Sequence, residues 1–161
     1  MTASFNLLDE PWIRVTRLDG APDEVSLLTL FREATNIAGI HGEIASQDVA
    51  ILRLLLAICH RAMDGPEDLD TWREYWEEPE RLGRDVIDYL ECYRERFDLR
   101  DPDRPFFQVA DIQGTVSPIS KMIIDTPKDF KRPLFTTRIG DGLESLSWSE
   151  AARLVDRKSV V

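Results

Sequence analysis

The sequence predicts an α+β fold with one core, in which an N-terminal β-hairpin and short strands pack with several α-helices. Residues 12–27 hold two short strand-like runs around an Asp-Gly dipeptide, residues 46–62 hold a long apolar helical run, and a Ser-x-x-Glu capping box begins at Ser147. An irregular basic loop is expected near 121–138. The length of 161 residues fits one domain with a substantial core.

The first element is the hairpin. The run from Trp12 to Leu18 alternates in part between apolar and polar residues, which is typical of a strand with one buried face. Asp19-Gly20 tolerates the positive φ of a tight turn, and residues 24–27 form the return strand. Because Ala21 and Pro22 also lie in the connection, a simple two-residue turn is not required by the sequence.

Helix signals follow along the chain. Ser26 can cap a short helix that reaches residue 34, and residues 36–42, with two glycines, are expected to be a connector. Ser46 opens the strongest helix, in which eleven of the fourteen residues from Val49 to Ala62 are apolar. A helix that is apolar almost all round belongs in the middle of a core. Asp64-Gly65-Pro66 ends it.

Residues 67–80 contain seven acidic side chains and one basic side chain. Trp72, Tyr75 and Trp76 are spaced three and four apart, so this segment predicts a helix with an aromatic face and an acidic face. We interpret the aromatic stripe as core packing, with a partner-binding face as the alternative. A further helix is expected over 81–97, and the capping box opens the last one.

Composition excludes several classes of protein. Thirty acidic residues against twenty basic ones give a net charge of −10. This charge argues against nucleic-acid binding over most of the surface and confines any such contact to a local basic patch. The most apolar stretch is too short and too charged to span a membrane. The N-terminus has no signal-peptide pattern, and Cys59 and Cys92 do not form a disulfide framework, so a cytoplasmic location is expected.

No pattern for catalysis or for a cofactor is present. Cys59 and His60 are adjacent on one helix, while His41 and Cys92 stand alone, which is not the spacing of a zinc site. The sequence has no G-x-S-x-G elbow, no phosphate-binding P-loop and no G-x-G-x-x-G. We interpret the acidic residues of 67–80 as a solvated helix face. The chain is therefore expected to be no enzyme, with no metal and no cofactor.

One segment is basic against this background. From Lys121 to Arg138 there are five basic and two acidic residues, with two phenylalanines among them. Single-stranded nucleic acid is typically bound by basic side chains, which contact phosphate, and by aromatic rings, which stack on the nucleobases. The alternative is an ordinary basic loop that two phenylalanines anchor to the core. The residues concerned are Lys121, Lys128, Phe130, Lys131, Arg132, Phe135 and Arg138.

The N-terminal run Phe5-Asn-Leu-Leu-Asp-Glu-Pro-Trp-Ile-Arg-Val15 resembles the opening of the CasA family, the large subunit of the type I-E CRISPR complex Cascade. Arg14 stands where proline is usual in that family. Four further blocks resemble family segments in order and approximate spacing, and together they extend the resemblance over nearly the whole chain. They are residues 47–56, 104–108, 117–122 and 134–138.

The resemblance implies a non-catalytic subunit of an RNA-guided antiviral complex. Its implied partners are the other Cascade subunits, the CRISPR guide RNA, target double-stranded DNA beside the protospacer-adjacent motif, and a helicase-nuclease that docks on it. By its place in Leu-Phe-x-x-Arg, Phe135 would contact the RNA handle, whereas Phe130 is the less favoured candidate. The side chains that would neutralise phosphate are Lys128, Lys131, Arg132 and Arg138.

Family members are much longer and end in a four-helix bundle. The resemblance therefore implies that residues 1–161 are a truncated N-terminal domain, with the C-terminal bundle absent from this chain. The alternative from the residues alone is an acidic protein-interaction module unrelated to CRISPR, which would use the aromatic helix of residues 67–80 as its partner face.

Overall fold

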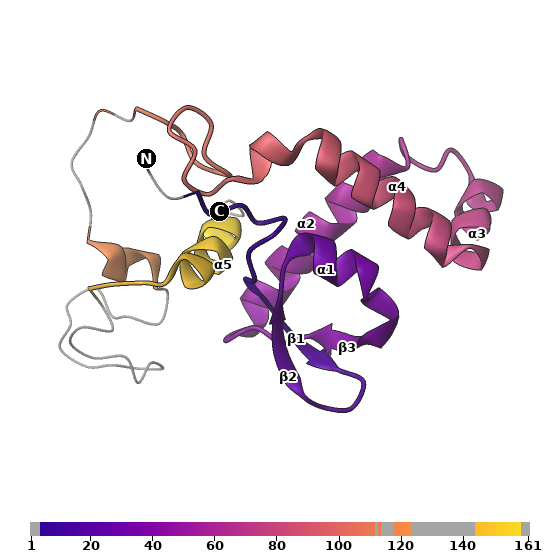
Figure 1. Ribbon diagram of the computed structural model, residues 1–161, viewed down its shortest axis with the longest axis horizontal. Coiled ribbons are helices and arrows are strands. Elements are labelled where there is room, and N and C mark those ends of the chain that lie inside the picture. Colours follow the sequence, from indigo (N-terminus) through magenta and orange to yellow (C-terminus); the bar gives the residue numbers. More distant parts are fainter. Residues whose placement is uncertain (1–3, 112, 114–117, 124–143, 159–161) are drawn as a thin grey trace.

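The structure is a computed structural model that describes residues 4–111, 113, 118–123 and 144–158. A small antiparallel sheet lies beside a set of helices, so the predicted α+β class is confirmed (Figure 1). The elements are β1 (Ile13–Arg17), β2 (Pro22–Val25), α1 (Leu27–Arg32), η1 (Ala34–Asn36), β3 (Ile37–Ile40), α2 (Ala45–Ala62), α3 (Leu69–Glu77), α4 (Pro79–Cys92), η2 (Arg94–Phe97), η3 (Ile119–Met122) and α5 (Trp148–Lys158).

The sheet has the order β2-β1-β3 and contains the predicted hairpin. The return strand is shifted from the predicted residues 24–27, since β2 includes Pro22 and residue 27 begins α1. In the β1–β2 pair, Ile13 lies opposite Val25, and the connection includes Gly20 with a φ of 85°. A side chain at that backbone angle would be strained, which explains the glycine. The expected connector of residues 36–42 is wrong in part, because four of its residues form β3 and pair with the free edge of β1.

The helix α1 begins as predicted. The backbone N–H of Thr29 donates to the Ser26 hydroxyl oxygen at 3.2 Å, so Ser26 caps the helix. Helix α1 then packs against α4, which ties the hairpin to the helical side of the molecule. The predicted helix over 81–97 is divided, since α4 ends at Cys92 and the tighter turn η2 carries the chain to Phe97.

Helix α2 is less central than its composition suggested. One face of α2 is buried through Ile51, Leu54 and Ile58, and it packs against α4 and α5. The opposite face is exposed, with more than half of each apolar side chain accessible at Val49, Leu52 and Leu56. The expectation of a helix buried all round is therefore wrong for the described chain, because no described element covers this second face.

The core joins the N-terminal segment to the sheet and helices. Leu7, Leu8 and Trp12 are fully buried, and the Trp12 indole N–H donates to the Leu7 carbonyl oxygen at 3.1 Å. A buried indole needs such a partner for its polar atom. The core also includes Ile13, Val15, Val25, Leu27, Leu28, Leu30, Ile51, Leu54, Ile58, Val86, Leu90, Phe97, Leu99, Phe106 and Ala152.

Candidate functional site

The sequence-predicted nucleic-acid contacts fall in the segment 124–143, which lies outside the described residues. They therefore stay a prediction. The residues are Lys128, Phe130, Lys131, Arg132, Phe135 and Arg138.

The elements that flank that segment are described, and they contact each other. On the entering side are η3 and Ile123, which is buried. On the leaving side is α5, which contacts η3 and packs on α2. The described residues on the two sides of the predicted segment therefore belong to neighbouring elements, η3 and α5.

The capping box at the start of α5 is formed as predicted. The backbone N–H of Glu150 donates to the Ser147 hydroxyl oxygen at 3.2 Å, and the backbone N–H of Ser147 donates to the Glu150 carboxylate at 2.9 Å. Each side chain thereby satisfies a backbone donor that the helix itself leaves open. The helix begins at a defined residue as a result.

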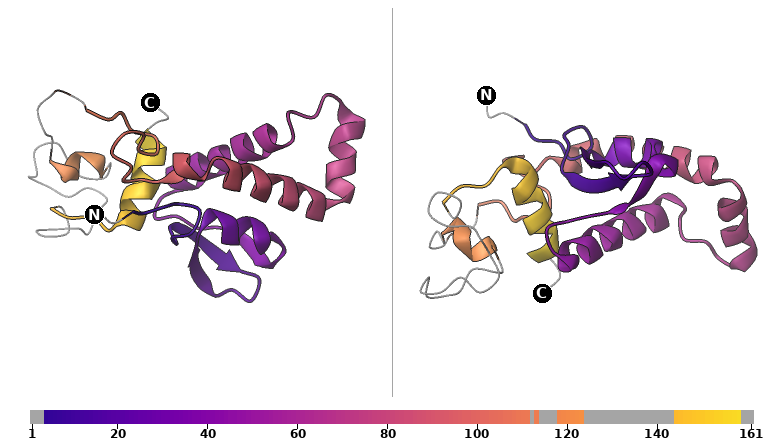
Figure 2. Two further views of the ribbon diagram at one scale, coloured as in Figure 1. Left: turned by 45° about the horizontal axis from the view of Figure 1, so that its top comes forward. Right: turned by 90° about the horizontal axis from the view of Figure 1, so that it is seen from below.

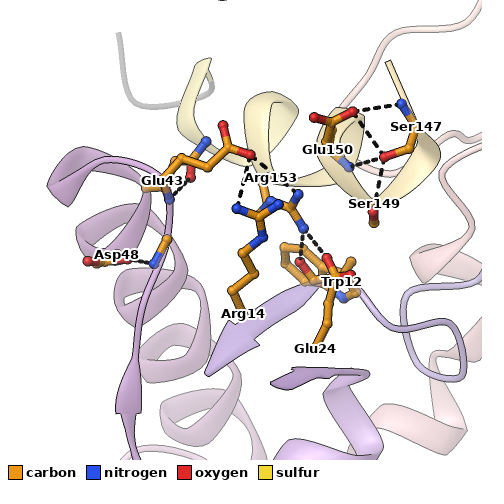
Figure 3. Close-up of polar contacts among 11 residues, drawn as sticks. Trp12, Arg14, Glu24, Glu43, Asp48, Ser147, Ser149, Glu150 and Arg153 are labelled. Carbon is orange, nitrogen blue, oxygen red and sulfur yellow. Dashed lines mark hydrogen bonds and ion pairs between the residues drawn. The ribbon is translucent and has the colours of Figure 1, made fainter. Parts of the chain in front are cut away.

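Arg153 attaches α5 to the sheet. Its side chain is only 1% exposed, and its guanidinium donates to the Trp12 carbonyl oxygen at 2.8 Å (Figure 3). It also forms an ion pair with Glu24 of β2 and a longer one with Glu43, at 3.7 Å. Arg14 of β1 shares Glu43, at 3.3 Å.

This buried arginine is a structural feature that the sequence did not reveal. Arg153 follows Ala152 and precedes Leu154, as any surface arginine on an amphipathic helix could. Its partners come from three separate parts of the chain, and Glu24 and Glu43 remain about one-third exposed. A buried charge requires paired and hydrogen-bonded surroundings. We therefore assign Arg153 to the joint between α5 and the sheet rather than to ligand contact.

A groove of about 830 Å³ lies between α2, the end of α4 and residues 103–110. Leu54, Ile58 and Phe106 supply an apolar floor, and Tyr93 and Phe107 at the groove are partly exposed. Residues 103–110 are held there because the Gln108 side-chain amide donates to the Leu99 carbonyl oxygen at 3.0 Å. The Pro-Phe-Phe-Gln block of the sequence thus has a clear structural role.

Two arginines, Arg61 and Arg96, also line this groove, and neither forms an ion pair within the described part of the chain. Guanidinium groups beside aromatic rings suit a ligand that combines a flat or apolar part with negative charge. The sequence reasoning missed this groove because its residues are scattered over 54–110.

Cys59 lies partly buried on α2. Burial raises the pKa of the Cys59 thiol, which keeps it protonated and a poor nucleophile at neutral pH. Among residues 4–111, 113, 118–123 and 144–158, no group of three or more His, Cys, Asp or Glu side chains is placed to hold a metal ion. In the same ranges, no helix is both long and apolar enough to cross a membrane.

Comparison with known proteins gives consistent matches. The sequence model of the family described as CRISPR-associated protein Cse1 matches residues 6–155. A Thermus thermophilus protein described as CRISPR-associated protein CasA/Cse1 is 36% identical over 156 residues, which cover 92% of this chain and 30% of the relative. The chain thus spans about a third of the length of that curated relative.

Solved structures match the same region. The crystal structure of Thermobifida fusca Cse1 is 40% identical, with a TM-score of 0.83, and the match covers 96% of this chain and 29% of that one. A chain from a CRISPR RNA-guided surveillance complex matches with a TM-score of 0.76 over 96% of this chain and 34% of its own. At 19% identity, that second match demonstrates a common fold.

Proposed function

The chain belongs to the CRISPR-associated Cse1 family, and on that premise we propose that it is a non-catalytic subunit of an RNA-guided interference complex of the Cascade type. The match of the family to residues 6–155 is the observation that carries the proposal. The fold likeness to a chain of an RNA-guided surveillance complex supports it further. In such complexes protein recognises a short motif and base pairing recognises the remaining sequence.

The proposed partners follow from that role. They are the other subunits, the guide RNA, target double-stranded DNA beside its protospacer-adjacent motif, and the helicase-nuclease. The matched region is about 30% of the curated relative, so we propose that this chain corresponds to the N-terminal part of the family's architecture. Membership of this family argues against the alternative of an acidic protein-interaction module unrelated to CRISPR.

The basic segment is the proposed contact with the RNA handle. Phe135 would stack on a base, while the phosphate charges would be balanced by the basic side chains Lys128, Lys131, Arg132 and Arg138. The described body supports this placement only through the two flanking elements, η3 and α5, which contact each other. The geometry of the segment itself stays a prediction.

The test is reconstitution of the complex from its other subunits, guide RNA and this chain. We expect Phe135→Ala to weaken retention of the chain, and Lys131→Glu with Arg132→Glu to weaken it more at low salt than at high salt. Losing two phosphate contacts to a single strand should lower the slope of log affinity against log salt by about 1.4. The matched control is Arg32→Glu with Arg84→Glu, which reverses two exposed charges without an ion pair in the described residues.

Two results would oppose the proposal. If the chain unfolds cooperatively, and is therefore folded, yet never enters the complex, the subunit role is wrong. If it enters and both double variants lower retention equally, the complex forms but the assignment of the RNA contact to 121–138 is wrong.

A further inference from the structure

Helix α3 lies at the end of the molecule opposite α5. Figures 1 and 2 show it beyond the sheet, across the far ends of α2 and α4. Among the described elements, α3 packs mainly against α4. A helix in this position has most of its surface available to another molecule.

The contacts of α3 leave its tryptophans exposed. Tyr75 attaches the helix, since its ring is buried beneath the Arg81 guanidinium at 5.0 Å and its hydroxyl donates to Asp85 at 3.3 Å. Trp72 is 43% exposed and Trp76 is 77% exposed. The core-packing interpretation of the aromatic stripe is therefore correct for Tyr75 and wrong for both tryptophans.

The exposed face is continuous. Leu69, which is 79% exposed, precedes Trp72 by three residues and Trp76 by seven, so the three side chains share one face of the helix. We call Leu69, Trp72 and Trp76 the tryptophan face. Tryptophan is among the residues most enriched at the energetic centres of protein interfaces. A face of this kind on a projecting helix is suited to insertion into an apolar pocket.

The charges around the tryptophan face restrict what can bind there. Residues 67–80 hold seven acidic side chains and one basic side chain, Arg73, which already pairs with Asp70 at 3.0 Å. Such a surface repels nucleic-acid phosphates and anionic lipid headgroups. A second copy of the chain, with its net charge of −10, is also unfavourable overall. A basic protein surface is complementary.

We propose that the tryptophan face docks onto the basic surface of another protein subunit of the same complex. Trp76 would fill an apolar pocket, and the acidic residues around it would pair with the rim. The identity of the partner rests on the proposed function. The chemistry of the face rests on the exposure and charge of α3.

The test uses the complete reconstituted complex with guide RNA. We expect Trp76→Ala to weaken retention of the chain by about 30-fold, the effect of a central interface residue. Leu18→Ala is the matched control, because Leu18 is an exposed apolar residue in the connection between β1 and β2. Figure 1 shows that connection apart from α3. Glu77→Lys with Glu78→Lys should slow association at low salt and have less effect at high salt.

A photo-crosslinking amino acid in place of Leu69 identifies the partner. We expect a crosslink to one basic subunit. Crosslinks to RNA, to a second copy or to the same polypeptide would overturn the proposal. Equal retention of the Trp76→Ala variant and the Leu18→Ala control would also overturn it. If the chain with its native sequence does not enter the complex, the subunit role and this proposal both fail. If it enters while the crosslink and Trp76 tests are negative, only this proposal fails.

Discussion

Replacing Arg153 by methionine should destabilise the protein by roughly 2–4 kcal/mol. Methionine keeps a long side chain but removes the donor to the Trp12 carbonyl oxygen, and an unsatisfied buried acceptor costs about 1–3 kcal/mol. The lost pair with Glu24 adds about 1 kcal/mol, because the carboxylate, being 35% exposed, is partly solvated once it loses its partner.

The matched control for this experiment is Arg14→Met. Arg14 also pairs with Glu43, but its side chain is 42% exposed, so its loss should cost less than about 1 kcal/mol. Both variants are compared with the native sequence by urea denaturation followed by far-UV circular dichroism, which gives the free energy of unfolding. Equal destabilisation by the two substitutions would refute the assignment of Arg153 to a buried joint.

Two further predictions concern Asp98 and Gly42. Burial pushes the pKa of Asp98 up, but hydrogen bonds from Ser4, Arg100 and Phe5 outweigh it and leave that pKa below its usual value. The stabilisation is therefore present above the ordinary carboxyl pKa of about 4 and is lost as the pH falls through the lowered pKa of Asp98. Asp98→Asn should destabilise the protein most at neutral pH and progressively less as the pH falls below about 4 in urea titrations. A pH-independent difference would contradict this. Gly42→Ala would place a Cβ 2.7 Å from the Asp48 carboxylate oxygen that accepts the Gly42 N–H, and it should lower the free energy of unfolding by about 1 kcal/mol. The same measurement checks it, and an unchanged midpoint would show that Asp48 relaxes freely.

Local signals predicted most of the secondary structure. The Asp-Gly turn, the Ser26 cap and the Ser147–Glu150 capping box each involve residues within a few positions, and all three are formed. Strand β3 escaped prediction because it depends on pairing with β1 rather than on its own short sequence. Tertiary context of that kind overrides propensity.

Burial was harder to predict than helix formation. The apolar composition of α2 and the aromatic spacing of α3 are typical of core helices, yet each leaves one apolar face exposed. Sequence periodicity shows which residues share a face, but it does not show whether the described chain covers that face. The burial of Arg153 could not be predicted from periodicity either, because its partners Trp12 and Glu24 are distant in the sequence.

The bond from Arg153 to Trp12 also has a consequence for synthesis. Its two residues are 141 positions apart, so the partner of Trp12 is made on the order of ten seconds after the strand that needs it, at the usual rates of translation. During that interval Glu24 lacks its Arg153 partner, while Glu43 can already pair with Arg14. The joint between α5 and the sheet can therefore form only after residue 153 has been synthesised.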